Sequence, residues 1–106
     1  MRVGQVIKLR PEYAEKYKEL HANPWPEIDR MIKQCKIQNY SIYVFDGLLF
    51  SYFEYVGDDY EADMAKMAAD PKTQEWWELC KPCQQPIDAA GENDWWYNIE
   101  EVYHLD

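Results

Sequence analysis

The chain is poor in cysteine and in basic residues, and it has no long apolar run. Its three cysteines (Cys35, Cys80 and Cys83) are too few and odd in number for a disulfide framework, which fits a reducing cytoplasm. No segment approaches the length that crosses a membrane, and residues 1–8 lack the apolar core of a signal peptide. We therefore expect a soluble, cytoplasmic protein.

Acidic residues outnumber basic ones by 20 to 11, so the net charge is −9. This charge argues against nucleic acid and anionic membranes as partners, because both attract basic patches. A neutral or cationic ligand fits better. With 106 residues, the chain is long enough for one core, and we expect a single domain over 1–106.

Aromatic residues are abundant, with five Trp and nine Tyr. Rings of this size supply much of the buried surface of a small protein. We expect some of them to line a pocket or a subunit interface rather than the core.

The first half of the chain predicts a strand, two helices and a hairpin. Val3–Leu9 alternates apolar and polar residues, as a strand does. Pro11 is placed at a helix start, so a helix is predicted to His21, and Pro26 opens the next. The predicted strands 39–45 and 48–56 flank Asp46-Gly47, the strongest short hairpin signal.

The second half predicts two helices, a loop and a strand. A helix is expected over Asp58–Ala69, with Met64, Met67 and Ala68 facing inward. Asp70 is the predicted N-cap of a helix from Pro71 to about Leu79. The remaining expectations are a loop over 82–94 and a last strand over 95–105 with a bulge at Glu100-Glu101.

This order, βα(α)ββα(α)β, predicts an α+β protein of the ferredoxin-like βαββαβ kind. The second strand is apolar on both faces, with Tyr40, Ile42 and Val44 on one and Tyr43 and Phe45 on the other. A small isolated domain usually leaves one sheet face in water. The pattern therefore predicts a homodimer in which two sheets close into a shared barrel.

His21, at the end of the first predicted helix, is the leading candidate for acid–base chemistry, because imidazole titrates near neutral pH. The structural alternative is a helix-end histidine that interacts with the last carbonyls. Tyr17 lies four residues earlier, so the phenol and the imidazole are neighbours on a helix and could share a substrate hydroxyl.

Trp76 and Trp77 are adjacent, so their rings diverge by about 100° on a helix. One is predicted to pack inward, while the other lines a cavity or a subunit interface. Indole rings pack well against the C–H faces of sugars. Trp95 and Trp96 either extend this wall or cap the core.

Cys80-Lys81-Pro82-Cys83 has the spacing of a redox or zinc motif, but we favour neither. The pair follows a helix instead of preceding one, so the helix dipole does not stabilise a thiolate. A closed zinc site needs four ligands, and only Cys35 and His104 could complete it. We expect no metal and no cofactor.

Five motifs appear in a characteristic order: Tyr17-x-x-x-His21, Asn23-Pro24-x-Pro26-Glu27, Asn39-Tyr40-Ser41-Ile42-Tyr43, Trp76-Trp77 and Glu101-Val102-Tyr103-His104-Leu105. Together they resemble the L-rhamnose mutarotase family over nearly the whole chain. The resemblance implies a dimeric α/β barrel that interconverts the α and β anomers of L-rhamnose without a cofactor. It also implies that His21 is the catalytic proton donor and that the sugar is contacted by Tyr17, Tyr40, Trp76 and Trp77.

In the mechanism expected from this resemblance, His21 protonates the ring oxygen of the sugar. The base could be Tyr17, a water or a carboxylate. L-fucose and other deoxy or neutral sugars stay open as alternative substrates. Two other functions remain open: a haem-handling or cofactor-poor monooxygenase, because this fold hosts several chemistries, and a non-enzymatic sugar-binding module.

Overall fold

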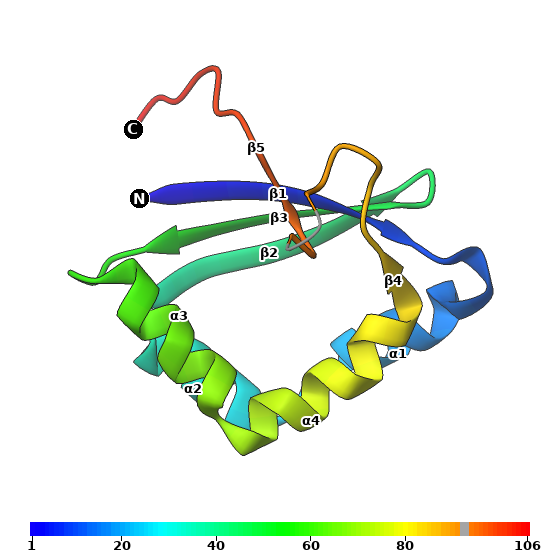
Figure 1. Ribbon diagram of the computed structural model, residues 1–106, viewed down its shortest axis with the longest axis horizontal. Coiled ribbons are helices and arrows are strands. Elements are labelled where there is room, and N and C mark those ends of the chain that lie inside the picture. The colour runs from blue at the N-terminus through cyan, green and yellow to red at the C-terminus, as the bar shows by residue number, and fades with distance from the viewer. Residues whose placement is uncertain (92–93) are drawn as a thin grey trace.

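An antiparallel sheet with its helices on one face forms the framework of the chain (Figure 1). The computed structural model describes residues 1–91 and 94–106. The elements follow in the order β1 (Arg2–Leu9), α1 (Ala14–Ala22), α2 (Pro26–Gln34), β2 (Ile37–Phe45), β3 (Leu48–Tyr55), α3 (Tyr60–Ala69), α4 (Pro71–Cys80), β4 (Gln84–Gln85) and β5 (Tyr97–Ile99).

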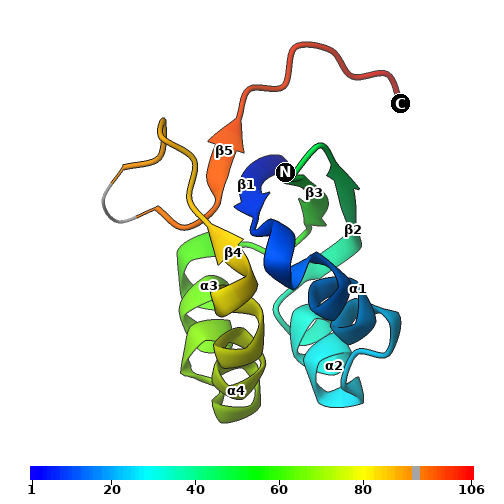
Figure 2. The same ribbon diagram turned by 90° about the vertical axis from the view of Figure 1, so that its right-hand side faces the viewer.

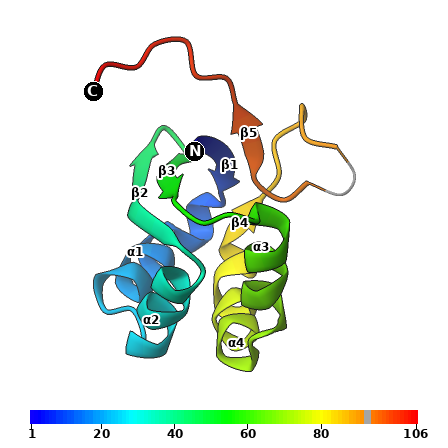
Figure 3. The ribbon, with the colours of Figure 1, turned by 90° about the vertical axis from the view of Figure 1, so that its left-hand side faces the viewer.

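The strand order is β2-β3-β1-β4, with β5 also paired to β1. The two middle strands, β3 and β1, are neighbours in the sheet, but α1, α2 and β2 separate them in the sequence. This is the predicted ferredoxin-like α+β arrangement, and the prediction is confirmed. The pairs α1/α2 and α3/α4 lie side by side under the sheet when the molecule is viewed from either end (Figures 2 and 3).

Local turn and cap signals place several elements where they were predicted. Asp46 and Gly47 both have positive φ, 53° and 72°, as the tight turn between β2 and β3 requires. The side chain of Asp70 accepts a hydrogen bond from the backbone N–H of Thr73 at 2.9 Å and caps α4. Asp59 caps α3 in the same way, so that helix begins at Tyr60 instead of Asp58.

The first helix begins later than predicted. Pro11–Tyr13 forms a 3-10 turn, and α1 runs from Ala14 to Ala22. In α3, Met64 and Met67 pack against a cluster of Ile37, Phe53 and Tyr55. Ala68 is exposed, so the prediction that it faces inward is wrong.

The predicted last strand over 95–105 is much shorter in the structure. Only Tyr97–Ile99 pairs, opposite Gly4–Val6 of β1, and no bulge forms at Glu100-Glu101. The reason lies in the partner strand. The register brings residue 101 opposite Arg2, where β1 begins, while Lys8 and Leu9 at the other end already pair with β4. That short strand, Gln84–Gln85, interrupts the predicted loop over 82–94; Glu92 and Asn93 of this loop lie outside the described residues.

The two sheet faces have different surroundings. Toward the helices, Leu49, Ser51, Phe53 and Tyr55 of β3 are buried. On the opposite face, Tyr43 is 64% exposed and Phe45 is 75% exposed, although they pair across strands with Phe50 and Leu48. The sheet therefore presents large apolar side chains to solvent on its helix-free face.

Candidate active site

Tyr17 and His21 lie next to each other on one face of α1. Their ring centroids are 4.1 Å apart and the planes are inclined by 27°, so the rings stack. The Nδ1 atom of His21 lies 2.9 Å from the backbone oxygen of Tyr17. Spacing of four residues on a helix brings the two side chains together, as the sequence predicted.

The hydrogen bond at Nδ1 determines which histidine nitrogen can take part in chemistry. A carbonyl oxygen only accepts, so Nδ1 carries the proton of the neutral ring and Nε2 has the free lone pair. Burial lowers the pKa of His21 below its ordinary value of 6.5, and the bond to the Tyr17 carbonyl opposes this effect only in part. The imidazole is therefore neutral at pH 7 and can accept a proton at Nε2.

A cavity of about 260 Å³ opens beside this pair. Its walls come from α1, β1, β2 and β3, and include Tyr17, Lys18, His21, Ile42, Val44 and Leu49. No Asp or Glu among the described residues lines it. The cavity is smaller than the roughly 300–1,000 Å³ that holds drug-sized ligands, so it suits a smaller molecule.

The Tyr17 hydroxyl is held from behind by a buried amide. Tyr17 is 4% exposed, and its oxygen accepts a hydrogen bond from Nε2 of Gln84 at 3.2 Å. The Oε1 atom of Gln84 in turn accepts from the indole Nε1–H of Trp95 at 2.7 Å. Burial raises the pKa of Tyr17, and nearby Tyr40 and Cys80 raise it further, so the phenol keeps its proton.

Tyr40 points toward the same side of the sheet as the helices. It follows an irregularity between Gln38 and Ser41, and its ring packs 5.6 Å from that of Phe53. The residue as a whole is 42% exposed, but desolvation raises the pKa of its phenol to about 12. Tyr40 therefore keeps its phenolic proton, but it is not among the residues that line the cavity.

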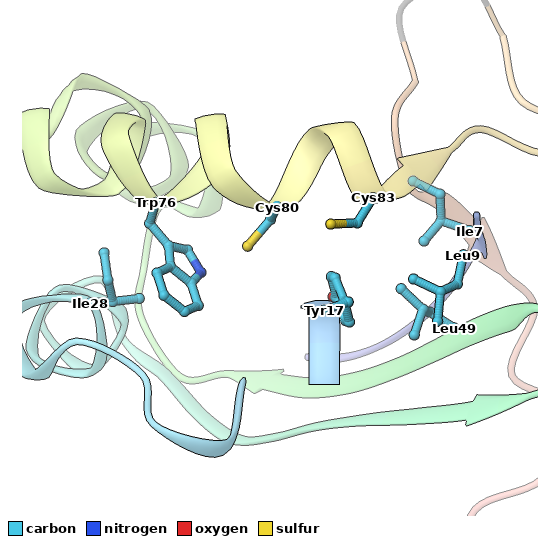
Figure 4. Packing of buried hydrophobic residues seen from close by; sticks show 8 residues of the cluster. All are labelled: Ile7, Leu9, Tyr17, Ile28, Leu49, Trp76, Cys80 and Cys83. Atoms are coloured by element: carbon cyan, nitrogen blue, oxygen red, sulfur yellow. The ribbon is translucent and has the colours of Figure 1, made fainter. Parts of the chain in front are cut away.

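Trp76 stands behind the histidine. Its ring meets His21 edge-on at 5.4 Å and Trp25 at 5.3 Å. In Figure 4, Trp76 points from the middle of α4 toward Ile28, while Cys80 at the end of α4 and Cys83 in the following 3-10 turn lie nearer Tyr17. Trp77 is half-buried, with the Lys81 ammonium 5.6 Å from its ring centre, and neither Trp76 nor Trp77 is among the residues that line the cavity. The prediction that one ring of the pair packs inward is confirmed, and that ring is Trp76.

The three cysteines are free and buried. Burial raises the pKa of Cys80 to about 12 and also raises that of Cys83, so both thiols stay protonated at neutral pH. Within residues 1–91 and 94–106, no group of three or more His, Cys, Asp or Glu side chains could hold a metal ion. In the same part of the chain, no helix combines the length and the apolar character needed to cross a membrane.

Comparison with known proteins identifies the family of the chain. A family model described as L-rhamnose mutarotase matches residues 2–105. The chain belongs to the L-rhamnose mutarotase family. An L-rhamnose mutarotase of Lactiplantibacillus plantarum is 33% identical to it over 109 residues, which cover 100% of this chain and 99% of that protein.

Solved structures agree with the fold. An L-rhamnose mutarotase of Formosa agariphila superposes with a TM-score of 0.76 at 22% identity, covering 100% of this chain and 99% of the other. Tetracenomycin F2 cyclase of Streptomyces glaucescens also superposes, with a TM-score of 0.69 at 18% identity and the same two coverages. Both matches place the chain in the dimeric α/β barrel class of fold.

Three residues in or around this candidate site were not assigned a role from the sequence: Lys18, Trp25 and Gln84. Lys18 lines the cavity, and Trp25 packs against Trp76. Lys18 lies three residues before His21 on α1, so this helical spacing was a usable signal. Gln84 carried no such signal, because it meets Tyr17 across 67 residues of sequence.

Proposed function

We propose that the protein is a mutarotase that interconverts the α and β anomers of L-rhamnose or a related deoxy sugar such as L-fucose. The observation that carries this proposal is the family match over residues 2–105, together with a neutral His21 beside a small cavity. The relatives that bear this name are isomerases. The three free cysteines fit action in a reducing cytoplasm.

The proposed reaction opens and closes the sugar ring. A proton leaves the anomeric hydroxyl, the bond between C1 and the ring oxygen breaks, and its electron pair goes to the ring oxygen, which takes up a proton. The aldehyde formed at C1 then turns and the ring closes on its other face by the reverse transfers. This sequence needs a group that can both accept and return a proton.

His21 fits that requirement. Its Nε2 accepts the anomeric proton in the neutral state and, once protonated, delivers a proton to the neighbouring ring oxygen. His21 therefore acts first as a base and then as the acid expected from the sequence. Tyr17 is a poor base because its pKa is raised, and no described carboxylate lines the cavity.

The tyrosines and tryptophans are proposed to hold the sugar. Tyr17 and Tyr40 keep their protons and donate hydrogen bonds to sugar oxygens. Trp76 and Trp77 are proposed to contact the apolar face of the ring and the methyl group of a deoxy sugar. Trp76 already packs against His21, and this favours a role at the edge of the sugar site.

We propose further that two copies pack their helix-free sheet faces together. The exposed rings of Tyr43 and Phe45 support this proposal, because side chains of this size lose unfavourable contact with water when a second sheet covers them. The partner in the proposed homodimer is a second copy of this chain.

Saturation-transfer NMR with a panel of aldoses tests the function. The experiment measures how fast the α and β anomers of each sugar exchange with and without the protein. Accelerated exchange of L-rhamnose, and weaker or no acceleration of sugars bearing a 6-hydroxyl, is the expected result. Exchange at the uncatalysed rate for every sugar would overturn the proposal, and tight binding without acceleration would indicate a sugar-binding module.

A further inference from the structure

Gln84 lies behind the cavity with both ends of its amide engaged. It is 5% exposed and belongs to the two-residue strand β4. Its Oε1 atom lies 2.7 Å from Nε1 of Trp95, and its Nε2 atom lies 3.2 Å from the hydroxyl oxygen of Tyr17.

The chemistry of the three groups fixes the direction of both hydrogen bonds. An indole N–H can only donate, so the oxygen end of the Gln84 amide must face Trp95. The NH₂ end then faces Tyr17 and donates to its oxygen. A flipped amide would place two donors, the amide NH₂ and the indole N–H, against each other.

The Tyr17 hydroxyl is thus an acceptor on the Gln84 side, and its own proton must point elsewhere. Among the described residues it has no acceptor for that proton. Tyr17 is itself among the residues that line the cavity, so this proton can be directed there, and the Lys18 ammonium on the cavity wall can only donate.

We propose that Gln84, anchored by Trp95, is a positioning residue that keeps the Tyr17 hydroxyl proton directed into the cavity. Tyr17 then donates to the bound molecule and does not accept from it. The site thereby selects a ligand with an acceptor oxygen at that point, such as the ring ether of a neutral pyranose, over one that presents a protonated amine. This inference rests on the proposed function, because it takes the ligand to be a sugar.

Two substitutions at Gln84 separate this role from a structural one. Gln84→Glu keeps the size and still accepts from Trp95, but its carboxylate also accepts from Tyr17 and turns the hydroxyl proton away from the cavity. Gln84→Leu removes both hydrogen bonds, which leaves the Tyr17 hydroxyl free to rotate and donate to a sugar. Gln85→Glu is the matched control, because Gln85 is the exposed neighbour on the same strand.

The measured quantity is kcat/KM for L-rhamnose exchange at mildly alkaline pH, where the carboxylate is ionised. We expect Gln84→Glu to lower kcat/KM about tenfold or more, because the Tyr17 hydroxyl then donates to the carboxylate and no longer to the sugar. We expect Gln84→Leu to lower kcat/KM only a few-fold. A structural role predicts the opposite order, because Leu leaves Trp95 and Tyr17 unpaired. Gln85→Glu should match the wild type.

The tyrosine hydroxyl itself supplies the second test. In a Tyr17→Phe background, Gln84→Glu should cause no loss beyond that of Gln84→Leu, because no hydroxyl remains to be turned. If Gln84→Glu unfolds the protein, Trp95→Phe is the substitute variant. It removes the indole N–H, so the Gln84 amide is free to flip, and kcat/KM should fall a few-fold only when Tyr17 is present.

The outcomes are distinct for the two proposals. If the wild-type protein does not accelerate exchange of any sugar, the proposed function is overturned. If the wild type is active and Gln84→Glu retains as much kcat/KM as Gln84→Leu or more, or if the losses persist unchanged in Tyr17→Phe, the positioning role alone is overturned.

Discussion

Replacing His21 with alanine separates the chemical contribution of this residue from its contribution to stability. The substitution removes the stack on Tyr17, the edge contact with Trp76 and one hydrogen bond to the α1 backbone. Each such contact contributes about 0.5–1.5 kcal/mol, and alanine returns part of this through its helix propensity. The expected net loss of stability is about 1–3 kcal/mol.

That loss leaves the protein folded. Domains of this size are stable by roughly 5–15 kcal/mol, so even the lowest starting value leaves more than nine-tenths of the molecules folded. General acid–base groups contribute about 10²–10⁴-fold to a rate. A fall of anomer exchange by about 10²-fold or more in His21→Ala would therefore be chemical in origin.

The assay pairs saturation-transfer NMR on L-rhamnose with a thermal melt of the same sample. His104→Ala is the matched control, because His104 is the second of the chain's two histidines and its bond to Asp106 lies in the exposed C-terminal segment. It should exchange the anomers at the wild-type rate. Retention of exchange within a few-fold of wild type by folded His21→Ala would refute the assignment.

Three further predictions follow from the same geometry. Exchange should fall as the pH drops, with a midpoint below 6.5, because protonation of His21 occupies Nε2 and burial lowers its pKa; a pH–rate profile with a midpoint above 6.5 would contradict this. Trp76→Ala should lower the free energy of unfolding by about 3–5 kcal/mol in a denaturant melt, since the ring is buried. Trp77→Ala should lower the free energy of unfolding by less and should mainly weaken sugar affinity in a titration, since its ring is only half-buried. Phe45→Asp should convert the proposed dimer to monomers in light scattering, and Val56→Asp, exposed but beyond the end of β3, should not; equal masses for both variants would exclude the helix-free face as the contact.

Features that depend on neighbours in sequence were predictable. The β2–β3 hairpin follows from two adjacent residues with positive φ, and the cap of α4 needs only Asp70 and the backbone three residues on. The Tyr17–His21 pair needs only the pitch of a helix. Each of these depends only on residues that are close in the sequence.

Features that depend on distant partners were not predictable. The composition of residues 95–105 predicts a long strand, but only Tyr97–Ile99 pairs with Gly4–Val6, and the start of β1 at Arg2 and the pairing of Lys8 and Leu9 with β4 set the outer limits of this pairing. The link between Gln84 and Tyr17 exists only because β4 lies against the end of β1 and brings residues from opposite ends of the chain together. No local pattern distinguishes Gln84 from Gln85, although one is buried and the other exposed.

The burial of the three thiols gives the chain an internal reporter of its own opening. A small alkylating reagent can reach Cys35, Cys80 or Cys83 only in molecules that have opened locally or globally. When closing is faster than alkylation, the modification rate measures the population of opened molecules. Cys35 ends α2, whereas Cys80 and Cys83 lie at the far end of α4, so mass spectrometry of the modified peptides would reveal which helix pair separates first from the sheet.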